Sequence, residues 1–287
     1  MVETDFVAPG PRLFDELVTA ALRAAGESTD PDRRVLVDHG SANLVVLVGA
    51  TAVRVSRTEQ AAAEVERAQR VIDGLPPLPF AVPRSRAEPV RAEGLIAIAQ
   101  RRLPGEPYPS GSGDPRELAS LLDALHRVPL DTVRADLAHP RAFMGGDAWR
   151  ELMTERVLPL LDLRARTRGG RAVEELAALE EPSEPSLVHG DLAGANVLWA
   201  DGRVCGLLDW DLASAGDPAE DVAALATWHG WDAITGVVSP GTEHRARVIA
   251  ATYPLQLVCF GIVHGRPSAE IDRAVERANR ALAARTV

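Results

Sequence analysis

Apolar positions in the first third of the chain alternate between a helical and a strand-like spacing. Over residues 13–25 they recur every three or four residues, which is typical of an amphipathic helix. Two β-branched runs, 43–48 and 52–56, are separated by a short link and predict a β-hairpin. Helical spacing returns over 59–73, and the apolar run 94–99 predicts a further strand. The pattern predicts a small part that combines strands with helices.

A stretch rich in turn-forming residues follows. Residues 104–115 contain four prolines and three glycines, which indicates a boundary. Beyond it the pattern is mainly helical, with long helices predicted over 115–128 and 147–163 and a weaker one over 174–179. Residues 186–191 suggest a short strand that enters a loop. The chain therefore divides into a first part with strands and a second, mainly helical part.

Composition narrows the class of protein. The 287 residues are 46% hydrophobic and 25% charged, which is ordinary for a globular chain that forms one domain or a two-lobed unit. No apolar run is long enough to span a bilayer, and the first residues lack the pattern of a secretory signal. The two cysteines, Cys205 and Cys259, exclude a disulfide framework. We expect a cytoplasmic protein with reduced thiols and no membrane partner.

Charge is unevenly distributed. All 31 basic residues are arginines, which excludes lysine Schiff-base chemistry. Between Glu180 and Asp232 there are eleven acidic residues and one basic residue, Arg203, so this segment carries as much net negative charge as the whole chain, −10. Phosphate backbones would be repelled there, whereas a metal ion or a cationic ligand would be attracted. We therefore expect no nucleic-acid partner.

One group of polar residues has a spacing that suggests catalysis. The triplet His189-Gly190-Asp191 is followed by Asn196 and then by Asp209. Apolar runs on either side of Asp201-Gly202 predict a tight hairpin, which would return Asp209 to the neighbourhood of Asn196. Carboxylate and amide oxygens suit Mg²⁺, while Asp191 is available to accept a proton from a hydroxyl group. This division of roles is what phosphoryl transfer from a nucleoside triphosphate requires. His189 itself is expected to have a structural, hydrogen-bonding role.

These motifs resemble a known family. HGDLAGAN, followed by LLDWD and GDPAEDVAAL, is similar to the aminoglycoside and related antibiotic phosphotransferases, a protein-kinase-like family. The resemblance covers nearly the whole chain, and its motifs are most similar to the viomycin and capreomycin phosphotransferase branch. It implies an α+β, bilobal, protein-kinase-like fold. Residues 1–103 would form a small β-rich N-lobe that binds nucleotide, and residues 104–287 a larger, mainly helical C-lobe with the catalytic loop, the metal site and the substrate-binding helices.

The resemblance also implies a nucleotide site. Arg54 stands where the family places a basic residue that holds the α- and β-phosphates, and Glu66 is the implied ion-pair partner, with Glu64 as the alternative. Ser41 and Asn43 belong to the stretch that resembles the nucleotide loop, although a plain turn is the rival interpretation of this stretch. The hinge that presents backbone groups to the purine is matched by Ala99, Gln100 and Arg101.

For the acceptor, the family's use of carboxylates directs attention to one predicted helix. Asp147, Glu151 and Glu155 recur at four-residue spacing and would lie on one helical face. They could be a solvated face supported by nearby arginines, or, with Asp211 of the acidic segment, part of a negative surface that attracts a cation.

The predicted function is transfer of the γ-phosphate of ATP or GTP, with Mg²⁺, to a hydroxyl of a small and cationic antibiotic. An aminoglycoside or a tuberactinomycin-type peptide would be such an acceptor, and the protein would act as a monomer and give resistance. A macrolide kinase and a metabolic small-molecule kinase are alternatives on the same fold. An inactive pseudokinase is favoured only by arginine in place of lysine at position 54, whereas the intact set of Asp191, Asn196 and Asp209 argues against it.

Overall fold

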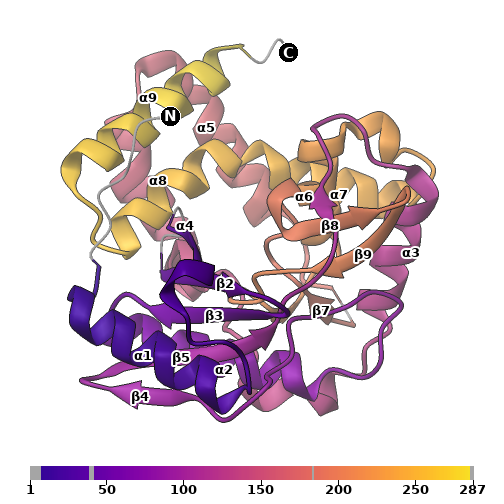
Figure 1. Cartoon of the computed structure of the whole chain (residues 1–287). Helices are drawn as coiled ribbons and strands as arrows, with labels where there is room; N and C mark the ends of the chain where they lie inside the picture. The colour runs from indigo at the N-terminus through magenta and orange to yellow at the C-terminus, as the bar shows by residue number, and fades with distance from the viewer. Residues whose placement is uncertain (1–7, 39–41, 183, 285–287) are drawn as a thin grey trace. The chain divides into compact units, whose positions relative to one another are not determined.

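The computed structural model describes residues 8–38, 42–182 and 184–284 (Figure 1). The chain forms two compact units. Unit 1 contains the residues up to Tyr108 together with the segments 131–137 and 195–211, and unit 2 contains the remainder. Two later segments therefore join the unit built by the first part of the chain. The division predicted at residues 103 and 104 stays a prediction.

Unit 1 is built on a five-stranded antiparallel sheet. Its strands run in the order β1-β2-β3-β5-β4. Their bounds are Val35–Val37 for β1, Asn43–Val48 for β2, Thr51–Ser56 for β3, Val90–Ala92 for β4 and Leu95–Arg101 for β5. The hairpin and the third strand expected from the sequence are confirmed.

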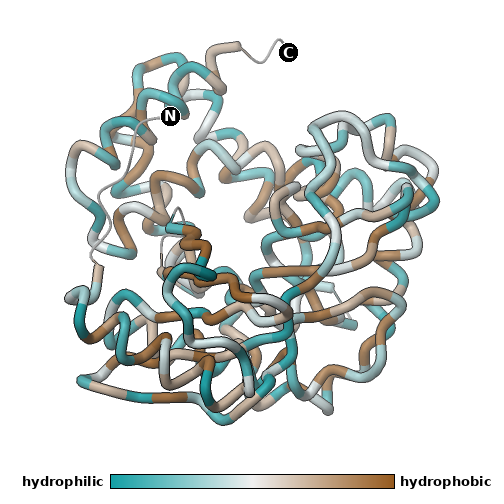
Figure 2. Tube along the Cα trace, in the orientation of Figure 1, coloured by the Kyte–Doolittle hydropathy of each residue, from teal (hydrophilic) through white to brown (hydrophobic). Residues whose placement is uncertain are grey.

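Helices cover both faces of this sheet. Successive side chains of a strand point to opposite faces, and both faces carry apolar side chains. Helix α1 (Pro11–Ala24) packs buried residues such as Leu17 against Val53 and Val55 of β3. Helix α2 (Glu59–Gly74) packs against β5, where Val65 joins Ile96 and Ile98 in a second cluster. In Figure 2 hydrophilic and hydrophobic segments alternate along α1. Because side chains alternate along β3, the residue between Val53 and Val55 points away from α1.

A three-stranded sheet completes unit 1, in the order β6-β8-β9. Strand β6 spans Glu106–Pro107, β8 spans Val197–Ala200 and β9 spans Arg203–Leu207. The turn between β8 and β9 has positive φ at Asp201 (50°) and Gly202 (77°), as a two-residue type I′ hairpin requires. The predicted hairpin is confirmed.

Unit 2 is mainly helical, with one small sheet in which β7 (Ser186–Val188) pairs with β10 (Ser214–Gly216). Its main helices are α3 (Pro115–His126), α5 (Leu163–Ala177), α6 (Ala219–His229), α7 (Pro240–Ala251), α8 (Tyr253–Val263) and α9 (Ser268–Ala284). Across the two units, 3₁₀ turns occur at Pro31–Arg33, Leu130–Thr132, Arg134–Asp136, Ala142–Met144, Leu158–Leu160, Gly194–Asn196 and Trp231–Ala233. A core of residues such as Met153, Val258 and Leu282 joins the C-terminal helices.

The prediction of one helix over 147–163 is wrong. The structure has a 3₁₀ turn at Gly146–Ala148, a single α turn at Trp149–Glu151 (α4), a π-helical segment at Leu152–Val157 and a further 3₁₀ turn. The number of residues per turn therefore changes three times along this segment, whereas the prediction assumed one regular α-helix.

The breaks in this segment leave its three acidic residues at the surface. Asp147 is 96% exposed and lies 3.6 Å from His139, and Glu151 and Glu155 are exposed as well. Both the placement of these residues on one helical face and their role toward an acceptor stay predictions.

No single helix in the described part of the chain has the length and apolar character needed to cross a membrane. Helices α7 and α8 meet that test only as a pair bent by 53°.

Candidate active site

A cavity of 470 Å³ lies within unit 1, on the face of the five-stranded sheet that points away from α1. Its volume is in the range usual for ligand sites. From the sheet it is lined by Asn43, Val45, Leu47, Ala52, Arg54 and Gln100. The segment 195–211 adds Ala195, Asn196, Leu198, Leu208, Asp209 and Asp211. Residues that are far apart in the sequence are therefore brought to one cavity.

Arg54 is the central polar residue of this cavity. Its side chain is only 10% exposed, and its Nη2 donates to Asp209 Oδ1 at 3.1 Å and to Asp211 Oδ2 at 2.5 Å. With the amide of Asn43 turned so that its oxygen faces the guanidinium, Oδ1 accepts from Arg54 Nε at 3.1 Å and from Nη2 at 2.8 Å. Arg54 is thus fixed by two carboxylates and one amide.

The electrostatics around Arg54 favour a further cation. Burial by itself lowers the pKa of the guanidinium, but the charges of Asp211 and Asp209 outweigh burial, and the pKa is raised. Asp211 Oδ1 is buried and has no hydrogen-bond partner among the described residues. A buried carboxylate oxygen without a partner is costly, so this corner of the cavity suits an additional positive charge.

Arg67 of α2 is a supporting residue that the sequence analysis did not identify. Its Nη2 donates to the carbonyl of Asp211 at 2.5 Å, and its Nη1 donates to the carbonyl of Asp136 at 2.9 Å. Burial lowers its pKa more than the nearby carboxylates raise it. Arg67 therefore positions the backbone that carries Asp211. Its helical spacing alone gave no signal, because the partner lies 144 residues away.

The expected ion pair between Arg54 and Glu66 is corrected by the structure. Glu66 Oε1 lies 2.6 Å from Arg91 Nη2 and 3.4 Å from Arg70 Nη1, at the outer side of α2. The carboxylates that contact Arg54 come from the segment after β9 instead. The partner of a helix residue can be predicted only when it is known which side of the helix faces the sheet. For α2 that side is determined by the packing of Val65 on β5.

Three of the other five predicted nucleotide-binding residues line the cavity, namely Asn43, Gln100 and Arg101. Ala99 is buried in the sheet, where its carbonyl accepts the N–H of Arg86 at 2.8 Å. Ser41 lies outside the described residues. Gln100 is oriented by α2, since its Nε2 donates to Gln69 Oε1 at 2.6 Å.

The two predicted metal ligands lie at the same cavity. The carbonyl of Asn196 accepts the N–H of Leu208 at 2.9 Å, which ties the two ends of the hairpin together. Asp209 has φ of 58°, an uncommon left-handed conformation for a residue other than glycine. It is followed by the fully buried Trp210, which fixes the chain direction. Hard oxygen donors on Asn196 and Asp209 fit the chemistry of Mg²⁺.

Unit 2 holds the predicted catalytic loop. Asp221 Oδ2 accepts the N–H of His189 at 2.9 Å and Asp221 Oδ1 accepts the N–H of Gly190 at 3.0 Å, so one buried carboxylate grips the backbone before Asp191. The ring Nδ1 of His189 accepts the N–H of Asp191 at 3.3 Å. Burial raises the pKa of Asp221, the hydrogen bonds from the two backbone N–H groups lower it, and the charge of Asp191 raises it again. The pKa that results is about 7. His189 and Asp221 thus shape the loop that presents Asp191.

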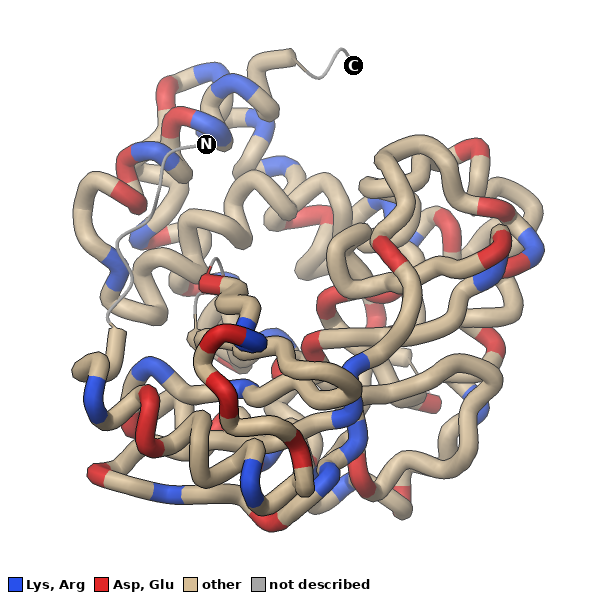
Figure 3. The backbone as a smooth tube through the Cα atoms, in the orientation of Figure 1, with Lys and Arg blue, Asp and Glu red and all other residues tan. Residues whose placement is uncertain are grey.

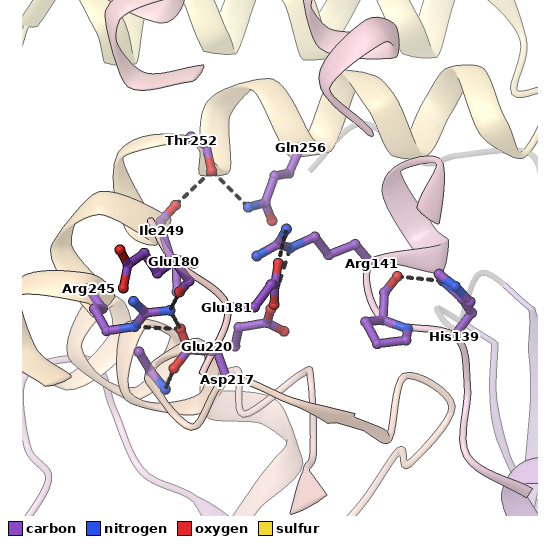
Figure 4. A network of polar contacts seen from close by, with 12 residues as sticks. His139, Arg141, Glu180, Glu181, Asp217, Glu220, Arg245, Ile249, Thr252 and Gln256 are labelled. Carbon is purple, nitrogen blue, oxygen red and sulfur yellow. Dashed lines mark hydrogen bonds and ion pairs between the residues drawn. The ribbon is translucent and has the colours of Figure 1, made fainter. Parts of the chain in front are cut away.

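Helix α6 begins at Ala219, with Pro218 at the N-cap position and Asp217 just before it. Asp217 still caps, because its Oδ1 accepts the N–H of Ala219 at 2.9 Å, but it also pairs with Arg245 through Oδ2. Glu220 does not reach back toward the cap. Figure 4 shows Arg141 pointing toward Glu220 and Glu181, and its nitrogens lie 3.7 Å and 3.8 Å from their carboxylates.

Glu220 lies in the same neighbourhood of unit 2 as the catalytic loop. With Arg141, Tyr253 and Gln256 it borders a small cavity that Gly190 also lines. Burial raises the pKa of Glu220 to about 7; Arg141 opposes this rise, and three neighbouring carboxylates reinforce it. The pKa of Tyr253 is raised by burial and then by Glu220, Asp221 and Asp191. Negative charge is therefore in excess around this cavity.

Comparison with known proteins agrees with these features. Residues 34–251 match the phosphotransferase enzyme family. A viomycin phosphotransferase from Streptomyces vinaceus is 35% identical over 159 residues, which are 50% of this chain and 54% of the relative, so the match spans about half the length of that protein.

Solved structures show the same fold. APH(2")-IIia, in a complex with GDP and kanamycin, matches 96% of this chain and 99% of its own, with a TM-score of 0.76 and 17% identity. The macrolide 2′-phosphotransferase MphH from Brachybacterium faecium matches 92% and 98%, with a TM-score of 0.71 and 23% identity. These similarities confirm the predicted α+β, kinase-like fold, with a β-sheet in the N-terminal part and helices in the C-terminal part. The chain belongs to the phosphotransferase enzyme family.

Proposed function

We propose that this protein transfers the γ-phosphate of ATP or GTP, in the presence of Mg²⁺, to a hydroxyl of a small cationic antibiotic. The observation that carries the proposal is the convergence of Arg54, Asn196, Asp209 and Asp211 on one cavity of unit 1. A fixed guanidinium beside hard oxygen ligands is what binding of a metal-complexed polyphosphate requires. The structures of relatives with GDP or ADP support a nucleotide as the donor.

In this proposal each residue has one task. Arg54, held by Asn43 and Asp211, offers its remaining donor capacity to phosphate oxygens. Asn196 and Asp209 would hold Mg²⁺, which neutralises phosphate charge when it is bound. The Asp191 carboxylate accepts the proton of the acceptor hydroxyl. Five peptide bonds link Asp191 to Asn196, so chain connectivity alone keeps their Cα atoms within about 18 Å.

A cationic acceptor is supported by unit 2. Four carboxylates, those of Glu181, Asp191, Glu220 and Asp221, stand in one neighbourhood with the guanidinium of Arg141. The loose contacts of Arg141, at 3.7 Å and 3.8 Å, leave the carboxylates of Glu181 and Glu220 able to receive an ammonium or guanidinium group from a ligand. This cluster is a better candidate for acceptor recognition than the exposed Asp147, because its carboxylates are held beside the loop that carries Asp191.

The direct test is a transfer assay with the purified protein. Aminoglycosides, tuberactinomycin-type peptides and macrolides would be incubated with ATP or GTP and Mg²⁺, and phosphorylated products would be detected by mass spectrometry. We expect a product with a cationic acceptor and no product when EDTA replaces Mg²⁺. A product only with neutral macrolides would overturn the cationic class. Nucleotide binding without transfer to any acceptor would favour an inactive scaffold.

The role of Arg54 can be tested by two replacements. Arg54→Ala should raise the nucleotide KM by about tenfold or more, because a charge-assisted contact with phosphate is lost. Arg54→Lys should retain measurable activity, since an ammonium keeps the charge but loses the forked geometry. Steady-state kinetics at fixed acceptor concentration measure both effects. Unchanged kinetics in Arg54→Ala would show that Arg54 only stabilises the fold.

Glu220 should make the stability of the protein depend on pH. A carboxyl whose pKa rises from 4.5 to about 7 on folding holds its proton more tightly in the folded state, so stability is lost as the pH rises between these values. Glu220→Gln removes this loss and should stabilise the protein at pH 8, by at most about 3 kcal/mol, with little effect at pH 4.5.

Urea unfolding of Glu220→Gln and the parent protein at several pH values measures this difference. Glu88→Gln, which changes an exposed glutamate, is the matched control. If the stability difference between Glu220→Gln and the parent protein is the same at all pH values, then the burial of Glu220 does not control its ionisation.

A further inference from the structure

A second cavity lies in unit 1 and, of the residues that the structure describes, shares only the strip Arg101, Arg102 and Leu103 with the nucleotide cavity. It has a volume of 740 Å³, and four of its lining residues are the arginines Arg84, Arg86, Arg101 and Arg102. We call it the arginine groove. Its remaining lining residues include apolar side chains such as Phe80, and among the described residues none that line it is an aspartate or glutamate. In a chain with a net charge of −10, such a local concentration of positive charge requires an explanation.

Backbone hydrogen bonds hold these arginines beside one another. The N–H of Arg101 donates to the carbonyl of Arg84 at 2.8 Å. The carbonyl of Ala50 accepts both the N–H of Arg102, at 2.9 Å, and the Nη1 of Arg86, at 3.1 Å. Several blue segments accordingly lie close together in this unit in Figure 3. The cluster is therefore set by the end of strand β5 and its neighbours, and not by flexible side chains alone.

The four guanidinium groups are not equivalent. Arg84 donates to four carbonyls at the end of α2, those of Ile72, Asp73, Leu75 and Pro76, which fixes its position. Arg86 uses one nitrogen in its contact with Ala50. The side chains of Arg101 and Arg102 are exposed and make no hydrogen bond or ion pair within the described residues. The groove thus combines fixed positive charge with donors that remain available.

Two carboxylates near the groove are already engaged in hydrogen bonds. Asp73 accepts from the N–H and hydroxyl of Ser85 and from Gln69. Glu27 accepts from the N–H of Ala50, the hydroxyl of Thr51 and the N–H of Ser28. They reduce the local positive charge without cancelling it, because four guanidinium groups face two carboxylates.

Apolar side chains give the groove a second character. Leu78, Phe80 and Leu103 line it together with the arginines. Guanidinium groups recognise phosphate oxygens through paired donors, while an apolar wall gains from covering a ring or a hydrocarbon chain. We propose that the arginine groove is a second anion site, which binds an organic phosphate, a molecule that joins phosphate to an apolar or aromatic body.

Ligand binding in the groove would also reach the nucleotide cavity. Arg101, Arg102 and Leu103 line both cavities, so a ligand that immobilises this strip changes the wall against which a nucleotide binds. This coupling rests on the proposed function, whereas binding in the groove does not. An organic phosphate would therefore regulate nucleotide affinity from the groove.

The test uses 1-naphthyl phosphate as the probe in isothermal titration calorimetry with the full chain. We expect saturable binding that weakens with rising salt, because screening shortens the field of the arginines. The double variant Arg86→Gln/Arg102→Gln should weaken binding by about tenfold or more. The matched control Arg23→Gln/Arg33→Gln removes the same charge from exposed residues elsewhere in unit 1 and should bind as the parent protein does.

Three results would overturn the proposal. The first is the absence of saturable binding, and the second is equal loss of affinity in the two double variants. The third is loss of binding in Arg54→Ala with retention in Arg86→Gln/Arg102→Gln, which would place the probe in the nucleotide cavity.

Inorganic pyrophosphate is the second probe, and if it binds as tightly as 1-naphthyl phosphate, the organic part of the assignment is wrong. A protein that fails to phosphorylate any antibiotic could still bind 1-naphthyl phosphate, so the two proposals fail separately.

Discussion

Replacement of Asp191 by Asn is expected to lower kcat by about 10²–10⁴-fold, the range usual for loss of a general base. The amide has nearly the same shape as the carboxylate but cannot accept the proton of the acceptor hydroxyl. The loop should keep its conformation, because Asp221 still accepts the backbone N–H groups of His189 and Gly190. Nucleotide affinity should therefore change little.

Single-turnover kinetics and nucleotide titration of the same preparation separate these two effects. Asp272→Asn, which changes an exposed aspartate of unit 2 with no assigned role, is the matched control and should keep full activity. A thermal melt checks that the loop variant is folded. Full turnover in Asp191→Asn would remove Asp191 from the proposed mechanism.

The second large effect is expected at Asp209. Asp209→Ala removes one of the two proposed ligands of Mg²⁺, and the affinity for the nucleotide in the presence of Mg²⁺ should fall by about a hundredfold or more. Titration with and without Mg²⁺ isolates the metal-dependent part of binding. Binding without Mg²⁺ should be affected much less, because Asp211 and Asn43 still hold Arg54 when its contact with Asp209 is lost.

Asp211 supplies the comparison for this experiment, because it contacts the same guanidinium and lines the same cavity. Within the part of the chain that the structure describes, its Oδ1 has no hydrogen-bond partner, which makes Asp211 the alternative ligand, whereas the proposal assigns the metal to Asn196 and Asp209. Asp211→Asn should keep Mg²⁺-dependent binding and lose stability, by about 1–3 kcal/mol, because the buried Arg54 loses a charged partner. The reverse result, with metal dependence lost in Asp211→Asn and kept in Asp209→Ala, would move the metal site to Asp211.

Local patterns in the sequence determined most of the elements and the chemical character of the site. Helices α1, α2 and α3 follow from apolar residues at helical spacing, and the hairpin of β8 and β9 follows from Asp201-Gly202 between two apolar runs. These features depend on neighbours a few residues apart, so one sequence is enough to predict them. The spacing of Asn196 and Asp209 likewise followed from one hairpin, and the structure places both residues at one cavity.

Only the tertiary structure decided which partners these residues have. Arg54 contacts Asp209 and Asp211, 155 and 157 residues away, and not Glu66, because the face that α2 presents to the sheet is set by long-range packing. The segment 147–163 is broken because its side chains pack against α8 and other turns of unit 2, which overrides a regular spacing.

The same reason explains the features that the sequence did not show. Asp221 positions the backbone of the loop that carries Asp191 through contacts with residues 31 and 32 positions away, which no local pattern indicates. The arginine groove joins residues from two sequence segments, 84–86 and 101–102, through the pairing of their backbones. Sequence periodicity determines which face of an element is buried. The partner of that face depends on how elements that are distant in the chain pack against one another. Such long-range contacts produce no pattern among neighbouring residues, so a single sequence does not reveal them.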